Sequence, residues 1–130
     1  MEGRAEISET DFHVEEDQPR AGTVVLSIAG DADLHAAPEL RARLTAAIDE
    51  GATAVVVDLS EATFVDSMAL GVLLRGTKEL RSTGGRLHLV VSRPDVRRIF
   101  EITMLDRVLA LHETRDAALS ASGGERPEDA

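Results

Sequence analysis

Residues 64–74 read Phe-Val-Asp-Ser-Met-Ala-Leu-Gly-Val-Leu-Leu, and this stretch carries the strongest structural signal in the chain. An apolar run stops at Asp66 and Ser67 and then resumes with the spacing of an α-helix. Either residue can accept hydrogen bonds from the first free backbone N–H groups of that helix. The residues that then share one face are Leu70, Leu73, Leu74 and Thr77, at i, i+3, i+4 and i+7. The pattern predicts an amphipathic helix that begins near Ser67 and runs to about Ser82.

Short apolar runs on either side of this helix alternate with further helical patterns. The expected strands are residues 12–16, 23–28, 54–57, 86–91 and 108–111. The expected helices begin near Pro38, Ser67, Pro94 and Thr114. The order is ββαβαβαβα, and helices inserted between strands imply right-handed crossovers. We therefore expect an α/β protein with a mostly parallel central sheet and helices packed on it.

Polar or glycine-containing segments separate these elements. Residues 17–22 are expected to connect the first two strands, and residues 29–30 (Ala-Gly) to end the second. Residues 31–35 then form a loop before the first helix, which Gly51 ends. The third strand is expected to close at Asp58.

The length of 130 residues leaves room for one domain with a single core. We expect residues 1–10 to be an acidic, flexible N-terminus, residues 11–121 to be the folded domain, and residues 122–130 to be a disordered tail. Only three residues are aromatic, so the core has to be aliphatic.

The formal net charge is −10, and the acids concentrate at the two ends of the chain. Residues 1–20 hold seven acids against two arginines, and residues 121–130 hold three against one. Such ends repel nucleic-acid phosphates and anionic lipids, and the chain lacks Trp and Tyr for base stacking. We therefore expect no nucleic-acid or membrane partner, and a monomer or weak dimer. No apolar run approaches the ~20 residues of a membrane span, which favours a cytoplasmic protein.

Acids at the expected strand ends suggest one enzymatic alternative. Asp31, Asp33 and Asp58 are placed like the acids of a phosphoacceptor receiver domain, with Asp58 as the acceptor. Such a domain needs a lysine at the end of a later strand. Lys78 is the only lysine, and it falls inside an expected helix. We therefore interpret these acids as solvated loop residues and keep the receiver domain as a distant alternative.

Other catalytic or metal-binding patterns are absent from the sequence. The histidines His13, His35, His88 and His112 lie on different elements without metal-ligand spacing, and we expect each at the surface or partly buried. There is no cysteine, and Ser67 has no Gly-x-Ser-x-Gly frame. We expect no catalytic residue, no metal and no cofactor.

Two segments resemble a known family. One is the loop Gly-Asp-Ala-Asp-Leu-His at residues 30–35. The other continues from Val-Asp-Leu-Ser at 57–60 through Phe-Val-Asp-Ser at 64–67 to Leu-Gly-Val-Leu-Leu at 70–74. Together with the order of elements, they resemble the STAS domain of bacterial anti-sigma factor antagonists. The resemblance covers residues 23–121.

This resemblance implies a binding module that catalyses nothing. Such an antagonist binds an anti-sigma factor, usually a serine kinase of the small ATPase fold, and so releases a sigma factor. The kinase phosphorylates the antagonist at the helix start and thereby ends the interaction. The partner-binding residues implied here are Asp33, His35, Asp66, Ser67, Met68 and Ala69.

The chain departs from the family pattern at the phosphoacceptor. The acceptor is the second hydroxyl of an Asp-Ser-Ser/Thr motif, and Met68 occupies that position. One hypothesis is a module that binds without this control and uses Met68 as apolar contact area. The other makes Ser67 a displaced acceptor, although a helix-capping role would turn its hydroxyl toward backbone N–H groups.

A different role for the same domain remains open. STAS domains also serve as scaffold subunits that bind a transporter ATPase or a sensory assembly, and the fold does not separate these roles.

Overall fold

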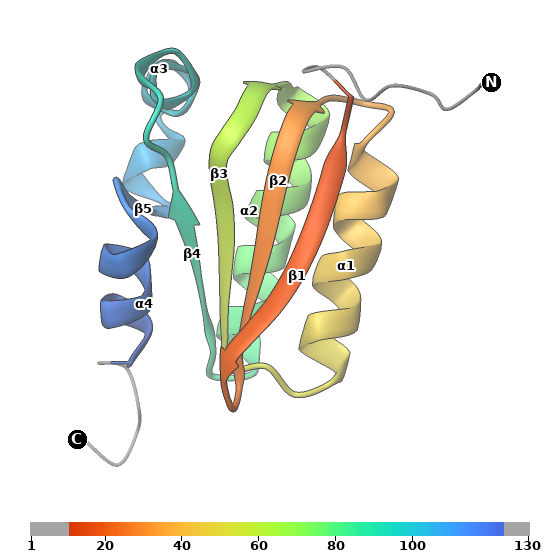
Figure 1. Ribbon diagram of the computed structural model, residues 1–130, viewed down its shortest axis with the longest axis vertical. Coiled ribbons are helices and arrows are strands. Elements are labelled where there is room, and N and C mark those ends of the chain that lie inside the picture. The colour runs from red at the N-terminus through yellow and green to blue at the C-terminus, as the bar shows by residue number, and fades with distance from the viewer. Residues whose placement is uncertain (1–10, 124–130) are drawn as a thin grey trace, which may run out of the picture.

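The computed structural model describes residues 11–123 (Figure 1). The strands are β1 (His13–Arg20), β2 (Thr23–Ala32), β3 (Ala54–Val65), β4 (Arg86–Val90) and β5 (Ala110–His112). The helices are α1 (Ala37–Asp49), α2 (Ser67–Ser82), α3 (Pro94–Ile102) and α4 (Arg115–Gly123), with a short 3₁₀ turn, η1 (Leu105–Arg107), before β5. Apart from η1, this is the predicted order.

The five strands form one mixed sheet in the order β1-β2-β3-β4-β5. β1 runs antiparallel to β2, and each of the following pairs is parallel. The prediction of a mostly parallel sheet with one initial hairpin is confirmed. Parallel pairing has a consequence for function, because it brings the carboxyl ends of β2, β3 and β4 to the same edge of the sheet.

Helices cover both faces of the sheet (Figure 1). Side chains of α1 and α2 pack on one face against alternate residues of β2 and β3. The helices contribute Leu40, Leu44 and Leu73 to this layer, and β3 contributes Val55 and Val57. On the other face, α4 places Ala118 against Val25, Val56 and Val90. The core is aliphatic as predicted, with Phe100 as the one fully buried aromatic side chain in residues 11–123.

β1 is longer than the sequence indicated. It continues through Pro19 to Arg20, so the predicted connection over residues 17–22 shrinks to Ala21 and Gly22. Proline is tolerated because β1 is an edge strand, where a missing N–H breaks no internal ladder. Gly22 has φ +80, a conformation that glycine adopts readily in so tight a turn.

β2 and β3 also extend beyond their predicted ends. β2 passes Gly30 and ends at Ala32, and β3 passes Asp58 and ends at Val65. The pairing absorbs two register shifts, and Gly30 adopts φ +85 beside one of them. Gly30 and Asp58, which the sequence suggested as strand ends, therefore lie inside two long strands, next to irregularities in the pairing.

The C-terminal helix corrects the predicted tail. Ser122 is buried and donates a hydrogen bond from its hydroxyl to the Ala118 carbonyl at 2.8 Å, and α4 ends only at Gly123. The tail was predicted to begin at residue 122. The predicted flexible residues 1–10 and the rest of the predicted tail, residues 124–130, lie outside the described residues.

Asp58 is buried, which corrects its interpretation as a solvated loop residue. One carboxylate oxygen accepts hydrogen bonds from the backbone N–H and the hydroxyl of Ser60 at 2.9 and 2.5 Å. The other accepts from Arg115 Nε at 3.2 Å, while the same guanidinium donates to Ser27 Oγ at 2.6 Å. Both oxygens of the receiver-type acceptor candidate are thus engaged, one by Ser60 within β3 and the other by Arg115, which holds α4 against the sheet.

Two histidines also meet in a way that their sequence positions did not predict. His88 of β4 is 2% exposed, so the prediction of a surface or partly buried residue is wrong for it. Its Nδ1 lies 3.0 Å from Nε2 of His112 on β5. Position 88 is on the same side of β4 as Val90, which faces α4, because side chains two residues apart share a face of a strand.

Replacing Arg115 with Met should lower the free energy of unfolding by about 1–3 kcal/mol, because Asp58 loses one partner while it stays buried. Urea denaturation monitored by circular dichroism measures this change. The double variant D58N/R115M should recover part of the loss, since the uncompensated charge is then gone. A single variant as stable as the wild type would contradict the assignment.

Candidate functional site

The extended ends of β2 and β3 bring two loops together at one edge of the sheet. Asp31 pairs with Phe64, and Ala32 pairs with Val65. The backbone N–H of Asp66 then donates to the Ala32 carbonyl at 3.1 Å. This bond joins the loop that precedes α1 to the first residues of α2. We call the surface formed there by residues 33–36 and 66–68 the docking corner.

Asp33 shapes the first half of the docking corner. Its carboxylate accepts hydrogen bonds from the backbone N–H groups of His35 and Ala36 at 3.0 and 3.2 Å. Its carbonyl accepts from the N–H groups of Ala36 and Ala37, both at 2.9 Å. The side chains of Leu34 and His35 are exposed on the turn that these bonds hold. Asp33 therefore acts in the isolated chain as the fixed frame of this turn.

Asp66, and not Ser67, caps helix α2. Its backbone is extended, and its Oδ1 accepts a hydrogen bond from the N–H of Ala69 at 3.0 Å. Ser67 is the first helical residue and is exposed. Its hydroxyl has no hydrogen-bond partner within residues 11–123, so the predicted capping role does not occupy it. The sequence left open which of the two residues caps the helix.

Two further predicted residues lie at different depths. Met68 exposes 56% of its surface, whereas Ala69 is completely buried. Ala69 therefore supports the docking corner from beneath instead of forming part of it. Its small side chain fits under the helix start, and its N–H is the one that Asp66 binds.

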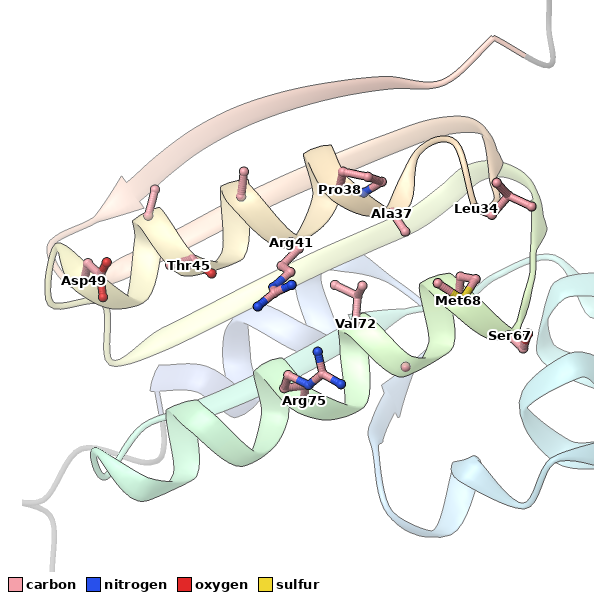
Figure 2. A pocket seen from close by; sticks show the side chains of 13 residues that line it. Leu34, Ala37, Pro38, Arg41, Thr45, Asp49, Ser67, Met68, Val72 and Arg75 are labelled. Carbon is pink, nitrogen blue, oxygen red and sulfur yellow. The ribbon is translucent and has the colours of Figure 1, made fainter.

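Sequence reasoning missed two exposed apolar side chains in this region. Leu34 is 56% exposed and lies beside Met68 (Figure 2), and Phe64 is 46% exposed at the end of β3. Leu34 follows Asp33 directly in a tight polar turn, which leaves little room to bury a large side chain. That position was the signal that could have placed Leu34 on the surface.

A groove begins at the docking corner and continues between α1 and α2 (Figure 2). Its volume is about 820 Å³. Leu34, Ser67 and Met68 line one end, and Asp49 lies at the other. The groove and the corner together form one continuous surface along the outer side of the two helices.

Within residues 11–123, no three His, Cys, Asp or Glu side chains gather in a way that could hold a metal ion. No helix in this part of the chain is both long and apolar enough to cross a membrane. Exposed apolar side chains on a hydrogen-bonded frame, as found at the docking corner, are common in protein-binding surfaces.

Comparison with known proteins gives a consistent result. Residues 16–118 match the model of the STAS domain family. The chain is similar to the anti-sigma-B factor antagonist of Bacillus subtilis, with 30% identity over 101 residues that cover 78% of this chain and 86% of the relative.

Solved structures agree with this result. An anti-sigma factor antagonist from Mycobacterium paratuberculosis has a TM-score of 0.80 and 29% identity, over 88% of this chain and 97% of its own. The anti-sigma factor antagonist SpoIIAA in its unphosphorylated form has a TM-score of 0.74 and 28% identity, over 86% and 97% of the two chains.

Replacing Asp66 with Ala should destabilise the protein by about 0.5–2 kcal/mol, because the α2 cap is lost. Asp66→Asn keeps an acceptor oxygen and should retain most of the stability, and Ser67→Ala should be neutral because its hydroxyl has no partner in residues 11–123. Urea denaturation of the three variants measures this order. Equal losses for Ser67→Ala and Asp66→Ala would show that the cap is assigned wrongly.

Proposed function

The chain belongs to the STAS domain family, and we propose that it acts as an anti-sigma factor antagonist. It binds an anti-sigma factor and so releases a sigma factor. The observation that carries this proposal is the docking corner, where the Asp66–Ala32 backbone bond joins the Asp33 turn to the start of α2. Similarity to the Bacillus subtilis anti-sigma-B factor antagonist and to SpoIIAA supports it.

The physical basis of binding is a preformed surface with apolar contact groups. The carboxylates of Asp33 and Asp66 accept hydrogen bonds from local backbone N–H groups. The backbone of the corner is therefore already ordered before a partner binds, which lowers the entropic cost of binding. Leu34 and Met68 supply apolar area that a partner can remove from water. His35 and Ser67 lie beside them as polar groups that can set orientation. We propose an anti-sigma factor of the kinase-like ATPase type as the partner.

Met68 removes the family's ordinary means of control. A thioether has no hydroxyl that could accept a phosphoryl group, so position 68 cannot carry the switch. Met68 instead adds to the apolar contact area. Under this proposal the amount of antagonist, or competition for its partner, sets the output.

Ser67 is the alternative acceptor, and the structure removes one objection to it. Its hydroxyl is exposed and has no partner in residues 11–123. A phosphate there would add about −1.5 to −2 charges at a helix N-terminus, which tolerates anions, and would alter the surface that meets the partner. The two hypotheses therefore differ in a measurable modification.

The proposed activity is binding without catalysis, and the cytoplasm is where a sigma factor and its regulators meet. A scaffold role with a transporter ATPase is the competing function within the same family. The identity of the partner separates the two.

Met68→Asp should weaken binding to the cognate anti-sigma factor by at least about tenfold, because a charge replaces apolar contact area at the corner. Isothermal titration with purified anti-sigma factors from the genome that encodes this chain measures the affinity. Val108→Asp is the matched control. Val108 is also exposed, but it lines a cavity with Gly85 and Arg86 at the opposite edge of the sheet, and this variant should bind like the wild type.

Two results would contradict the proposal. One is a wild-type chain that binds none of these anti-sigma factors but binds a transporter ATPase. The other is equal loss of binding in Met68→Asp and Val108→Asp, which would place the contact away from the docking corner.

Incubation with the cognate kinase and ATP should leave the intact mass of the wild-type chain unchanged. Met68→Ser restores a hydroxyl at the family's acceptor position, and this variant should gain one phosphoryl group and then lose affinity for the anti-sigma factor. Phosphorylation of the wild type that disappears in Ser67→Ala would instead make Ser67 the acceptor.

A further inference from the structure

We propose that the groove between α1 and α2 receives an amphipathic helix of the protein partner, with acidic side chains placed against Arg41 and Arg75. This inference rests on the proposed function in one respect, since it takes the anti-sigma factor as that partner. It adds a second contact region that continues from the docking corner along the two helices (Figure 2).

The walls of the groove are solvent-facing helix surfaces with few charges. On α1 the wall residues are Ala37, Pro38, Arg41, Ala42, Thr45, Ala46 and, at the far end, Asp49; from Pro38 on they recur at i, i+3, i+4, i+7, i+8 and i+11. On α2 they are Ser67, Met68, Gly71, Val72 and Arg75, and from Met68 on they recur at i, i+3, i+4 and i+7. A solvent-facing stripe of a surface helix is ordinarily polar or charged. Small and apolar residues here leave room for another chain to approach closely.

Gly71 has no explanation within the described fold. A Cβ added at Gly71 would meet nothing within 4 Å, whereas a Cβ at Gly76 would lie 3.1 Å from Leu44 Cδ1. Packing of α1 against α2 therefore explains Gly76 but not Gly71. A glycine inside a helix is destabilising relative to alanine. Close approach of a partner to the groove wall accounts for a glycine at position 71.

Charge indicates what kind of helix fits. Figure 2 shows the side chains of Arg41 and Arg75 extending toward one another from opposite walls. Neither guanidinium has a hydrogen-bond or ion-pair partner in residues 11–123, although Arg43, which lies on α1 outside the groove lining, pairs with Glu16 and Glu39. Two facing cations favour an anionic occupant. This local charge is opposite to the net charge of −10 of the chain.

The shape of the groove favours a helix over a small molecule. α1 and α2 each begin at the docking corner, where β2 and β3 end. Both helices then run back along the sheet, so the groove is an open channel between them (Figure 1). A small ligand is usually enclosed over most of its surface. An amphipathic helix laid into an apolar groove needs only one buried face.

Variants on the groove walls test the inference with the full-length chain and the anti-sigma factor. Gly71→Leu should weaken binding by at least about tenfold by filling the groove, and Lys78→Leu, on an exposed position of α2 outside the groove, should change it less than about twofold. The charge reversal R41E/R75E should also weaken binding, while K78E/R81E, which changes the net charge equally, should not. Gly71→Ala should raise the melting temperature, which shows that the site tolerates a side chain in the isolated fold.

The outcomes separate this inference from the proposed function. If Met68→Asp abolishes binding while Gly71→Leu and R41E/R75E bind like the wild type, the docking function stands and the groove contact is wrong. If the wild type binds no anti-sigma factor, the proposed function fails, and a peptide titration decides the groove.

The probe for that titration is a synthetic helical peptide with Leu and Ala on one face and Glu flanking it, compared with a peptide in which Lys replaces Glu. Binding of the Glu peptide to the ¹⁵N-labelled full-length chain should shift the amide resonances of Ala42, Gly71 and Val72, and the Lys peptide should not. Absent shifts, equal shifts with both peptides, or shifts elsewhere would overturn the inference. Self-association that Gly71→Leu abolishes in sedimentation would assign the groove to a second copy of the chain and would also overturn it.

Discussion

The Asp66 N–H to Ala32 carbonyl hydrogen bond is the constraint on which the site depends. It closes the parallel pairing of β2 and β3 at their last residues and fixes the start of α2 beside the turn that precedes α1. Without this pairing, Asp33 and Asp66 would frame two independent loops. With it, their carboxylates each satisfy free backbone N–H groups of one rigid corner, and the side chains that remain exposed are Leu34, His35, Ser67 and Met68.

The elements set by local patterns could be predicted from the sequence, whereas the ends of β2 and β3 could not. Hydrophobic spacing located α2 from Ser67 to Ser82, because one apolar face repeats over four turns. The ends of β2 and β3 were not predictable in this way. Gly30, Asp58 and Ser60 are typical of loops, and they are accommodated inside strands by pairing with distant residues and by Arg115. Local propensity does not register such tertiary partners.

Some features of the candidate site could likewise be predicted from the sequence, and others could not. The polar frame was visible in the sequence, because Asp33 and Asp66 occupy positions where carboxylates satisfy backbone N–H groups. The depth of Ala69 was not visible, because a small apolar residue in the first turn of a helix can lie on either face, and Ala69 proved to be buried. The groove behind the corner depends on the distance between α1 and α2, which no one-dimensional pattern records. Gly71 is informative only once the structure shows that nothing in the described fold occupies the space beside it.

The central claim is that the chain acts by presenting this edge of the sheet to an anti-sigma factor. Hydrogen–deuterium exchange of the full-length chain, with and without its cognate anti-sigma factor, tests it most directly. The account predicts new protection at the turn around residues 33–37 and over the first turns of α2, and this protection extends along α1 where the groove is occupied. Protection on α4 and β5, or no change at the corner in a complex that forms, would contradict it.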